Sequence, residues 1–174
     1  MDLAKTLFDV IDTRSFSNVW YWLVLAVSWS TVTRFTLGVP YDMVTRARRK
    51  GGEAQDDLIE MVAINVRRMM YIVDVSGLWL AGFWAFLMSA LSLLAFWYGL
   101  ELAQALALLF LPFTLVGLMT FRTARIVAET QPEPAELYKR LMRHRFWTHV
   151  IGMISVFITA VFGMYHNLSV VPGF

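Results

Sequence analysis

Residues 75–121 read VSGLWLAGFWAFLMSALSLLAFWYGLELAQALALLFLPFTLVGLMTF, and this stretch decides the fold. Glu101 is its only charged residue, and Asp74 and Arg122 stand at its two ends. A helix of about 20 apolar residues crosses the hydrocarbon core of a bilayer, which is roughly 30 Å thick. The stretch is long enough for two such crossings, with residues 98–101 (Tyr-Gly-Leu-Glu) as the polar break between them. It therefore predicts a transmembrane helical hairpin.

The composition of the 174-residue chain is also typical of a membrane protein. Hydrophobic residues make up 58% of the chain and its mean hydropathy is positive. Soluble domains are usually about 45–50% apolar. The length is that of one domain, so we expect a single membrane domain over residues 1–174. Cysteine is absent, which excludes disulfides, thiolate metal ligands and cysteine nucleophiles.

Two further apolar stretches flank the hairpin. The first carries Trp20-Tyr21-Trp22, whose amphipathic rings suit the headgroup level of a membrane. Gly38-Val39-Pro40 stops it, because proline cannot continue the helical hydrogen bonds. The predicted fold is therefore all-α, a polytopic membrane protein with four transmembrane helices. The spans are predicted at about residues 15–37, 75–98, 102–121 and 146–168.

Lysine and arginine are unequally distributed around these spans. Residues 38–74 and 122–145, together with Arg34, hold 13 of the 15, and only Lys5 and Arg14 lie elsewhere. Because cytoplasmic loops retain positive charge, we predict that both basic segments are cytoplasmic. The N- and C-termini are then on the periplasmic side of a bacterial inner membrane.

Helical extensions are expected outside the spans. Gly51-Gly52 breaks the first basic segment, and an apolar stripe at helical spacing predicts a helix that begins near Glu53 and runs into the second span. Residues 135–144 predict a similar helix that continues into the fourth span. Residues 1–14 have the apolar spacing of a short interfacial helix, with a loosely ordered tail as the alternative.

A basic cluster just beyond the end of the first span is the leading candidate for a binding site. Such a cluster attracts anionic lipid headgroups by about 1 kcal/mol per charge, or binds an acidic partner. The alternative is that it only fixes the orientation of the chain in the membrane. Without an aromatic platform or a known motif, nucleic-acid binding is not predicted. The cluster comprises Arg46, Arg48, Arg49 and Lys50.

Arg34 and Asp74 fall near the same predicted membrane interface. A carboxylate is costly there unless it is paired, so we predict a structural ion pair of Asp74 with Arg34 or with an adjacent arginine such as Arg67 or Arg68. The pair with Arg34 would join the first span to the second. A role in proton movement would require titratable groups through the bilayer, and Glu101 is the only one within residues 75–121.

Two helices carry small residues at helical spacing, a pattern that allows close helix contact. The contact could lie within the bundle or with a neighbouring chain, and the sequence does not distinguish the two. On the second span the face comprises Gly77, Ala81, Ala85 and Ser89, and on the fourth it comprises Thr148, Gly152, Ser155, Thr159 and Gly163.

The histidines do not predict a haem site within one chain. His149 and His166 are 17 residues apart, about 25 Å along a helix, whereas two axial ligands must lie at one depth. A ligand pair formed across a symmetric dimer is the alternative. We expect no cofactor, no metal site and no catalytic constellation, and therefore no enzymatic activity.

Two short segments resemble a known family. Residues 12–22 (DTRSFSNVWYW) and 38–44 (GVPYDMV) are similar to an uncharacterised family of small alphaproteobacterial inner-membrane proteins. Some members of that family are labelled as a component of the Suf iron–sulfur assembly complex. The resemblance covers mainly the first 50 residues and assigns no functional residue. A chain without cysteine could not itself hold a cysteine-ligated cluster.

Three functions follow as hypotheses. The first is a non-enzymatic accessory or scaffold subunit, which packs through small-residue helix faces with copies of itself or within a larger membrane complex. The second is a small oligomeric channel or transporter, suggested by Pro112 and by the polar residues Ser28, Ser30 and Thr31. The third is an enzyme acting on lipids, for which only Asp74 and His149 are available as interfacial titratable groups.

Overall fold

The computed structural model describes residues 16–170. These residues form helices and one two-stranded antiparallel sheet. The interfacial helix predicted over residues 1–14 lies outside the described residues. The elements are α2 (Val19–Arg34), β1 (Phe35–Thr36), β2 (Val39–Pro40), α3 (Tyr41–Lys50), α4 (Glu53–Ser92), the short π-helix η1 (Leu93–Trp97), α5 (Glu101–Thr130) and α6 (Pro134–Val170).

Three of the helices are long and apolar enough to cross a membrane, as expected for a membrane protein. They are α4 with η1 (Glu53–Trp97), α5, and α6 up to Leu168. The predicted all-α fold is thus confirmed, together with three helices that are long and apolar enough to span a membrane. The first predicted span corresponds to α2, which has 16 residues and is therefore about 24 Å long. Its crossing stays a prediction.

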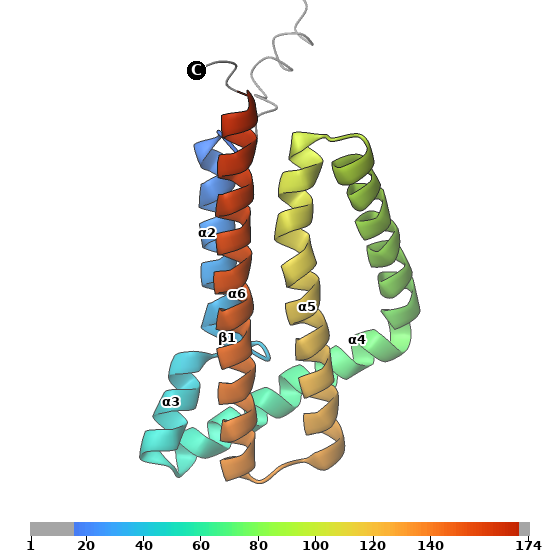
Figure 1. Cartoon of the computed structure of the whole chain (residues 1–174). Helices are drawn as coiled ribbons and strands as arrows, with labels where there is room; N and C mark the ends of the chain where they lie inside the picture. The colour runs from blue at the N-terminus through green and yellow to red at the C-terminus, as the bar shows by residue number, and fades with distance from the viewer. Residues whose placement is uncertain (1–15, 171–174) are drawn as a thin grey trace, which may run out of the picture.

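The helices α2, α5, α6 and the second half of α4 run alongside one another (Figure 1). The first half of α4 lies across one end of this bundle, which we call the base. Helix α3 and the connection between α5 and α6 are also at the base, whereas both ends of the described chain are at the opposite end (Figure 1). The two basic segments therefore lie together at one end of the molecule.

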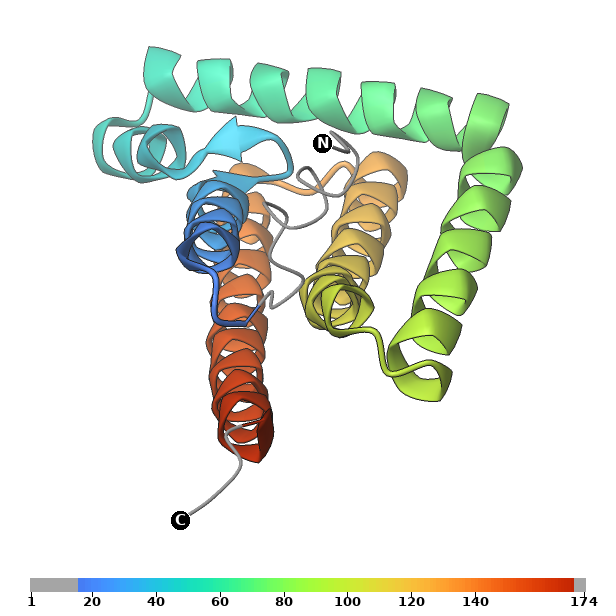
Figure 2. The ribbon, with the colours of Figure 1, turned by 90° about the horizontal axis from the view of Figure 1, so that it is seen from above.

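Helix α4 contains a sharp bend. With η1 it forms 45 residues of helix, which would extend about 68 Å if straight, more than twice the thickness of a hydrocarbon core. Figures 1 and 2 show the bend in the green part of α4, where the first half turns from the base into the bundle. The sequence of α4 contains one Ser-Gly pair, Ser76-Gly77, and such pairs are a common cause of kinks. The predicted helix from Glu53 into the second span is confirmed.

The first half of α4, before the bend, packs in an apolar core like that of a soluble protein. Leu58, Val62 and Val66 recur every four residues and are buried. They pack with Val44 of α3 and Leu141 of α6 in one apolar cluster. The base is therefore held together by ordinary hydrophobic burial among α3, α4, α5 and α6.

The part of the bundle above the base has the opposite pattern. Thr148, Ser155 and Thr159 of α6 are buried, whereas Phe157 and Leu168 of the same helix are 69% exposed. Helices in lipid show this arrangement, because small residues allow close contact and large apolar side chains face the acyl chains. The burial pattern of α6 is consistent with a membrane protein.

The first helix ends three residues earlier than its predicted limit at residue 37. A two-residue turn at Leu37 and Gly38 joins β1 to β2, and both residues have positive φ, 51° and 75°. That is the geometry of a type I′ hairpin, which usually contains asparagine or glycine. Leucine is strained there by roughly 1–2 kcal/mol, and Leu37 is only 1% exposed, so burial of its side chain offsets the strain.

Substitution of the turn glycine tests this hairpin. In Gly38→Ala, the left-handed backbone is strained and the new Cβ would lie 3.2 Å from Asn65 Nδ2. We expect a loss of about 1–2 kcal/mol in the free energy of unfolding, measured by denaturant titration in mild detergent. Gly117→Ala is the control, because nothing lies within 4 Å of its Cβ, and it should be neutral or slightly stabilising. Equal losses in both variants would contradict the assignment.

Candidate functional site

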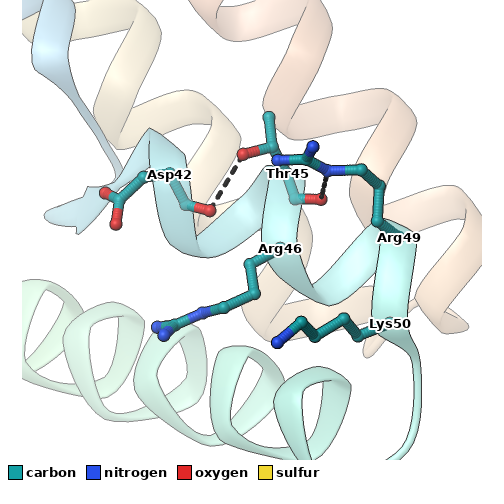
Figure 3. A pocket seen from close by; sticks show the side chains of 5 residues that line it. All are labelled: Asp42, Thr45, Arg46, Arg49 and Lys50. Atoms are coloured by element: carbon teal, nitrogen blue, oxygen red, sulfur yellow. Dashed lines mark hydrogen bonds between the residues drawn. The ribbon is translucent and has the colours of Figure 1, made fainter.

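The outward face of α3 carries three of the four residues of the basic cluster predicted from the sequence, Arg46, Arg49 and Lys50. These three side chains are exposed, whereas Val44 and Ala47 of the same helix are buried. Pro40 precedes the helix and Gly51 follows it at φ 62°, the usual proline-before and glycine-after arrangement. A hollow of about 410 Å³ lies on the outward face (Figure 3). Its walls are formed by Asp42, Thr45, Arg46, Arg49 and Lys50.

The side chains in this hollow are arranged around its cations. Arg46 and Lys50 extend in the same direction, one helical turn apart (Figure 3). Arg49 Nε donates a hydrogen bond to the Thr45 carbonyl at 3.4 Å, and the Thr45 hydroxyl donates to the Asp42 carbonyl at 2.9 Å. Within residues 16–170, no carboxylate lies within 4.0 Å of any of these three cations. Their charge therefore remains available for an anionic oxygen group such as a lipid phosphate.

Arg48 is separated from the other three members of the predicted cluster. Its Nη1 lies 3.3 Å from the sulfur of Met142 on α6. At 100° per residue, Arg48 is about 160–200° from Arg46 and Lys50 around the helix. The sequence alone could have predicted this separation, because helical periodicity places Arg48 on another face.

A contact that the sequence did not reveal fixes α3 to α6. The guanidinium of Arg145 lies over the ring of Tyr41, 3.6 Å from the ring centre. Cation–π contacts of this kind contribute about 0.5–1 kcal/mol at exposed sites. The two residues are more than 100 positions apart, and no local sequence pattern indicates such a pair.

The predicted ion pair between Arg34 and Asp74 is not formed. Among the described residues, the only Lys or Arg side chain within 4.0 Å of a carboxylate is Arg140, which lies 3.1 Å from Glu136. The physical reason is the course of α4, which runs away from α2 across the base before it bends (Figure 1). Arg34 and Asp74 are both exposed.

Glu101 instead joins three segments at the end opposite the base. Its carboxylate accepts a hydrogen bond from the Phe16 backbone N–H at 2.8 Å and contacts His166 Nε2 at 3.2 Å. The Phe16 ring is 2% exposed and packs against Phe162 of α6. The sequence marked Glu101 as a break between spans, but not as a link from α5 to α6 and to the segment before α2.

The structure distinguishes the two small-residue faces. On α6, Gly152, Ser155, Thr159 and Gly163 are buried inside the bundle. A Cβ on Gly152 would lie 2.9 Å from the ring of Trp29, and one on Gly163 would lie 3.2 Å from the ring of Phe16. On α4, by contrast, Ala81, Ala85 and Ser89 are exposed and Gly77 is half-buried. Among the contacts of residues 16–170, only the α6 face is buried within the bundle.

The side chains that could bind a haem or a metal ion do not lie close together in the described part of the chain. His149 Nδ1 lies 2.9 Å from the Arg145 carbonyl, and His149 stands near the middle of α6, 17 residues before His166. Across residues 16–170, no three His, Asp or Glu side chains are grouped so that they could hold a metal ion.

Compared with known proteins, the chain matches no family model, no curated protein and no solved structure. The resemblance of residues 12–22 and 38–44 to an inner-membrane family stays a prediction.

The hollow on α3 predicts a difference between neighbouring arginines. Arg46→Gln should weaken the binding of phosphatidylglycerol by about 1 kcal/mol, because one cation of the hollow is lost. Arg48→Gln carries the same charge change on another face and should have a smaller effect. Native mass spectrometry of the detergent-purified protein with added phosphatidylglycerol measures both. Equal losses would show that only total charge matters.

Proposed function

We propose that this chain is a non-enzymatic accessory or scaffold subunit of a bacterial inner membrane, which assembles through the exposed small-residue face of α4. The supporting observation is the contrast between the two such faces. The face on α6 is filled by side chains of the same chain, whereas no side chain of the described residues 16–170 buries Ala81, Ala85 or Ser89 on the α4 face. A helix from outside the chain would complete it.

The exposure of α4 is greater than that of the other candidate spans. In the most apolar 18 residues of α4, 6% are buried, compared with 28% in α5 and 28% in α6. Exposure of large apolar side chains to lipid is normal and indicates no partner. Small residues differ, because they gain little from lipid and allow two helices to approach closely. Ala81, Ala85 and Ser89 recur every four residues on one side of α4, which suits a second transmembrane helix.

In the proposed arrangement α2 is the fourth transmembrane helix. It runs alongside α6 (Figure 1), with Trp20 near one end and Arg34 at the other. A helix of about 24 Å is shorter than the hydrocarbon core, and such helices are accommodated by local thinning and by side chains that reach toward the headgroups. The base then faces the cytoplasm, as the distribution of positive charge predicts. Its cations would contact anionic headgroups.

The channel hypothesis has weaker support. A pathway within one chain would have to follow the buried polar face of α6, and the rings of Trp29 and Phe16 pack against it at Gly152 and Gly163. A pathway between copies would require a closed homo-oligomer. Such an assembly, together with ion or solute flux in reconstituted vesicles, would favour a channel over a scaffold.

The decisive experiment is extraction from native membranes in mild detergent, with the mass and the composition of the complex determined together. We expect an assembly larger than one chain. Ala81→Leu combined with Ala85→Leu should weaken it by about 1–3 kcal/mol, because larger side chains overpack the interface.

Ala26→Leu combined with Ala160→Leu is the matched control. Both alanines are exposed, on α2 and α6, and lie outside the α4 face. The control should leave the assembly intact. A wild-type protein that is monomeric in native lipid and has no co-purifying partner would overturn the proposal.

A further inference from the structure

A groove of about 570 Å³ lies between the first half of α4, the end of α5 and the start of α6. Its wall is mainly apolar and includes Val62, Val66 and Met70 of α4. Val127 of α5 and Leu137 of α6 close the other side. Arg67 is the one charged residue among the described residues that line it. The groove is separate from the hollow on α3, with which it shares no lining residue.

The size and chemistry of the groove suit an amphipathic ligand. Small-molecule sites usually measure about 300–1,000 Å³, with apolar walls and a few polar groups that fix the ligand. The apolar wall would accept a hydrocarbon chain. The Arg67 guanidinium offers a planar set of donors that matches a phosphate, and no carboxylate among residues 16–170 lies within 4.0 Å of it.

The position of the groove indicates where the ligand comes from. Met70 is the last residue of α4 in the groove wall, and the second half of α4, which follows it, runs into the bundle (Figure 1). In an amphipathic helix lying at the membrane surface, this level corresponds to the boundary between headgroups and acyl chains. A lipid of the surrounding bilayer can therefore reach the groove without leaving the membrane.

We propose that this groove binds one anionic phospholipid, with an acyl chain along the apolar wall and the phosphate on Arg67. The proposal does not depend on the scaffold function, since it concerns a different face of α4. It also separates two adjacent arginines of equal charge. Arg67 lines the groove and Arg68, about 100° further around the helix, does not.

The test uses the detergent-purified full-length protein with phosphatidylglycerol, and phosphatidylcholine as the zwitterionic comparison. In the Arg46→Gln background, which weakens the hollow on α3, native mass spectrometry should show one phosphatidylglycerol that binds at least tenfold more tightly than phosphatidylcholine. Arg67→Gln should reduce that affinity about tenfold, and Arg68→Gln by less than threefold. Equal effects of the two substitutions, or equal binding of the two lipids, would overturn the proposal.

A second readout tests the position of the acyl chain. Phosphatidylglycerol with a photoreactive diazirine in its acyl chain should crosslink to residues 59–70 or 127–137. Ala63→Leu should suppress this crosslinking, because the larger side chain narrows the groove. If Ala63→Leu does not fold, Ala128→Leu on the facing wall tests the same point. The acyl chain would lie elsewhere if the crosslinks were confined to other segments. The same conclusion would follow if crosslinking were unchanged in Ala63→Leu or Ala128→Leu protein that is folded.

Discussion

The close contact between α6 and the aromatic rings before and within α2 is the interaction on which the bundle depends. In lipid, apolar side chains gain nothing by leaving their surroundings, so helices associate through close fit. Trp29 packs onto Gly152 and Phe16 onto Gly163, where an added Cβ would lie 2.9 Å and 3.2 Å from the two rings. Two hydroxyls of the same face are satisfied within α6: Thr148 donates to the His144 carbonyl at 2.9 Å and Thr159 to the Ser155 carbonyl at 2.8 Å. The Ser155 hydroxyl is buried there and has no hydrogen-bond partner among residues 16–170.

The base is stabilised in a different way, by the burial of apolar side chains. Its apolar side chains are buried as in a soluble domain, with Leu58 and Leu141 both fully buried. The bend of α4 connects the base to the part of the bundle above it, because one helix can lie across the base and then enter the bundle (Figure 2). Both candidate lipid sites, the hollow on α3 and the groove beneath α4, lie in this basal layer. The layer combines unpaired cations with apolar walls, which is the chemistry of a phospholipid at its headgroup.

The sequence predicted the helices better than their contacts. The length of the apolar run in residues 75–121 predicted the hairpin, because a bilayer sets the length of a spanning helix. The early end of α2 was not predictable, since leucine rarely adopts the left-handed conformation that Leu37 takes. The predicted Arg34–Asp74 pair failed because the direction of α4 across the base depends on packing between distant segments. Periodicity identified both small-residue faces, but which one is filled depends on Trp29 and Phe16, far away in the chain.

The crossing of α2 is the central claim, because it places the basal layer on one side of the membrane and the chain ends on the other. The absence of native cysteine allows single cysteines to be introduced without background. Ser17→Cys precedes α2 and Glu53→Cys follows α3, and both positions are exposed. With a membrane-impermeant maleimide on spheroplasts, we predict labelling of Ser17→Cys, and labelling of Glu53→Cys only after the membrane is disrupted. Labelling of both cysteines from the same side would contradict the account.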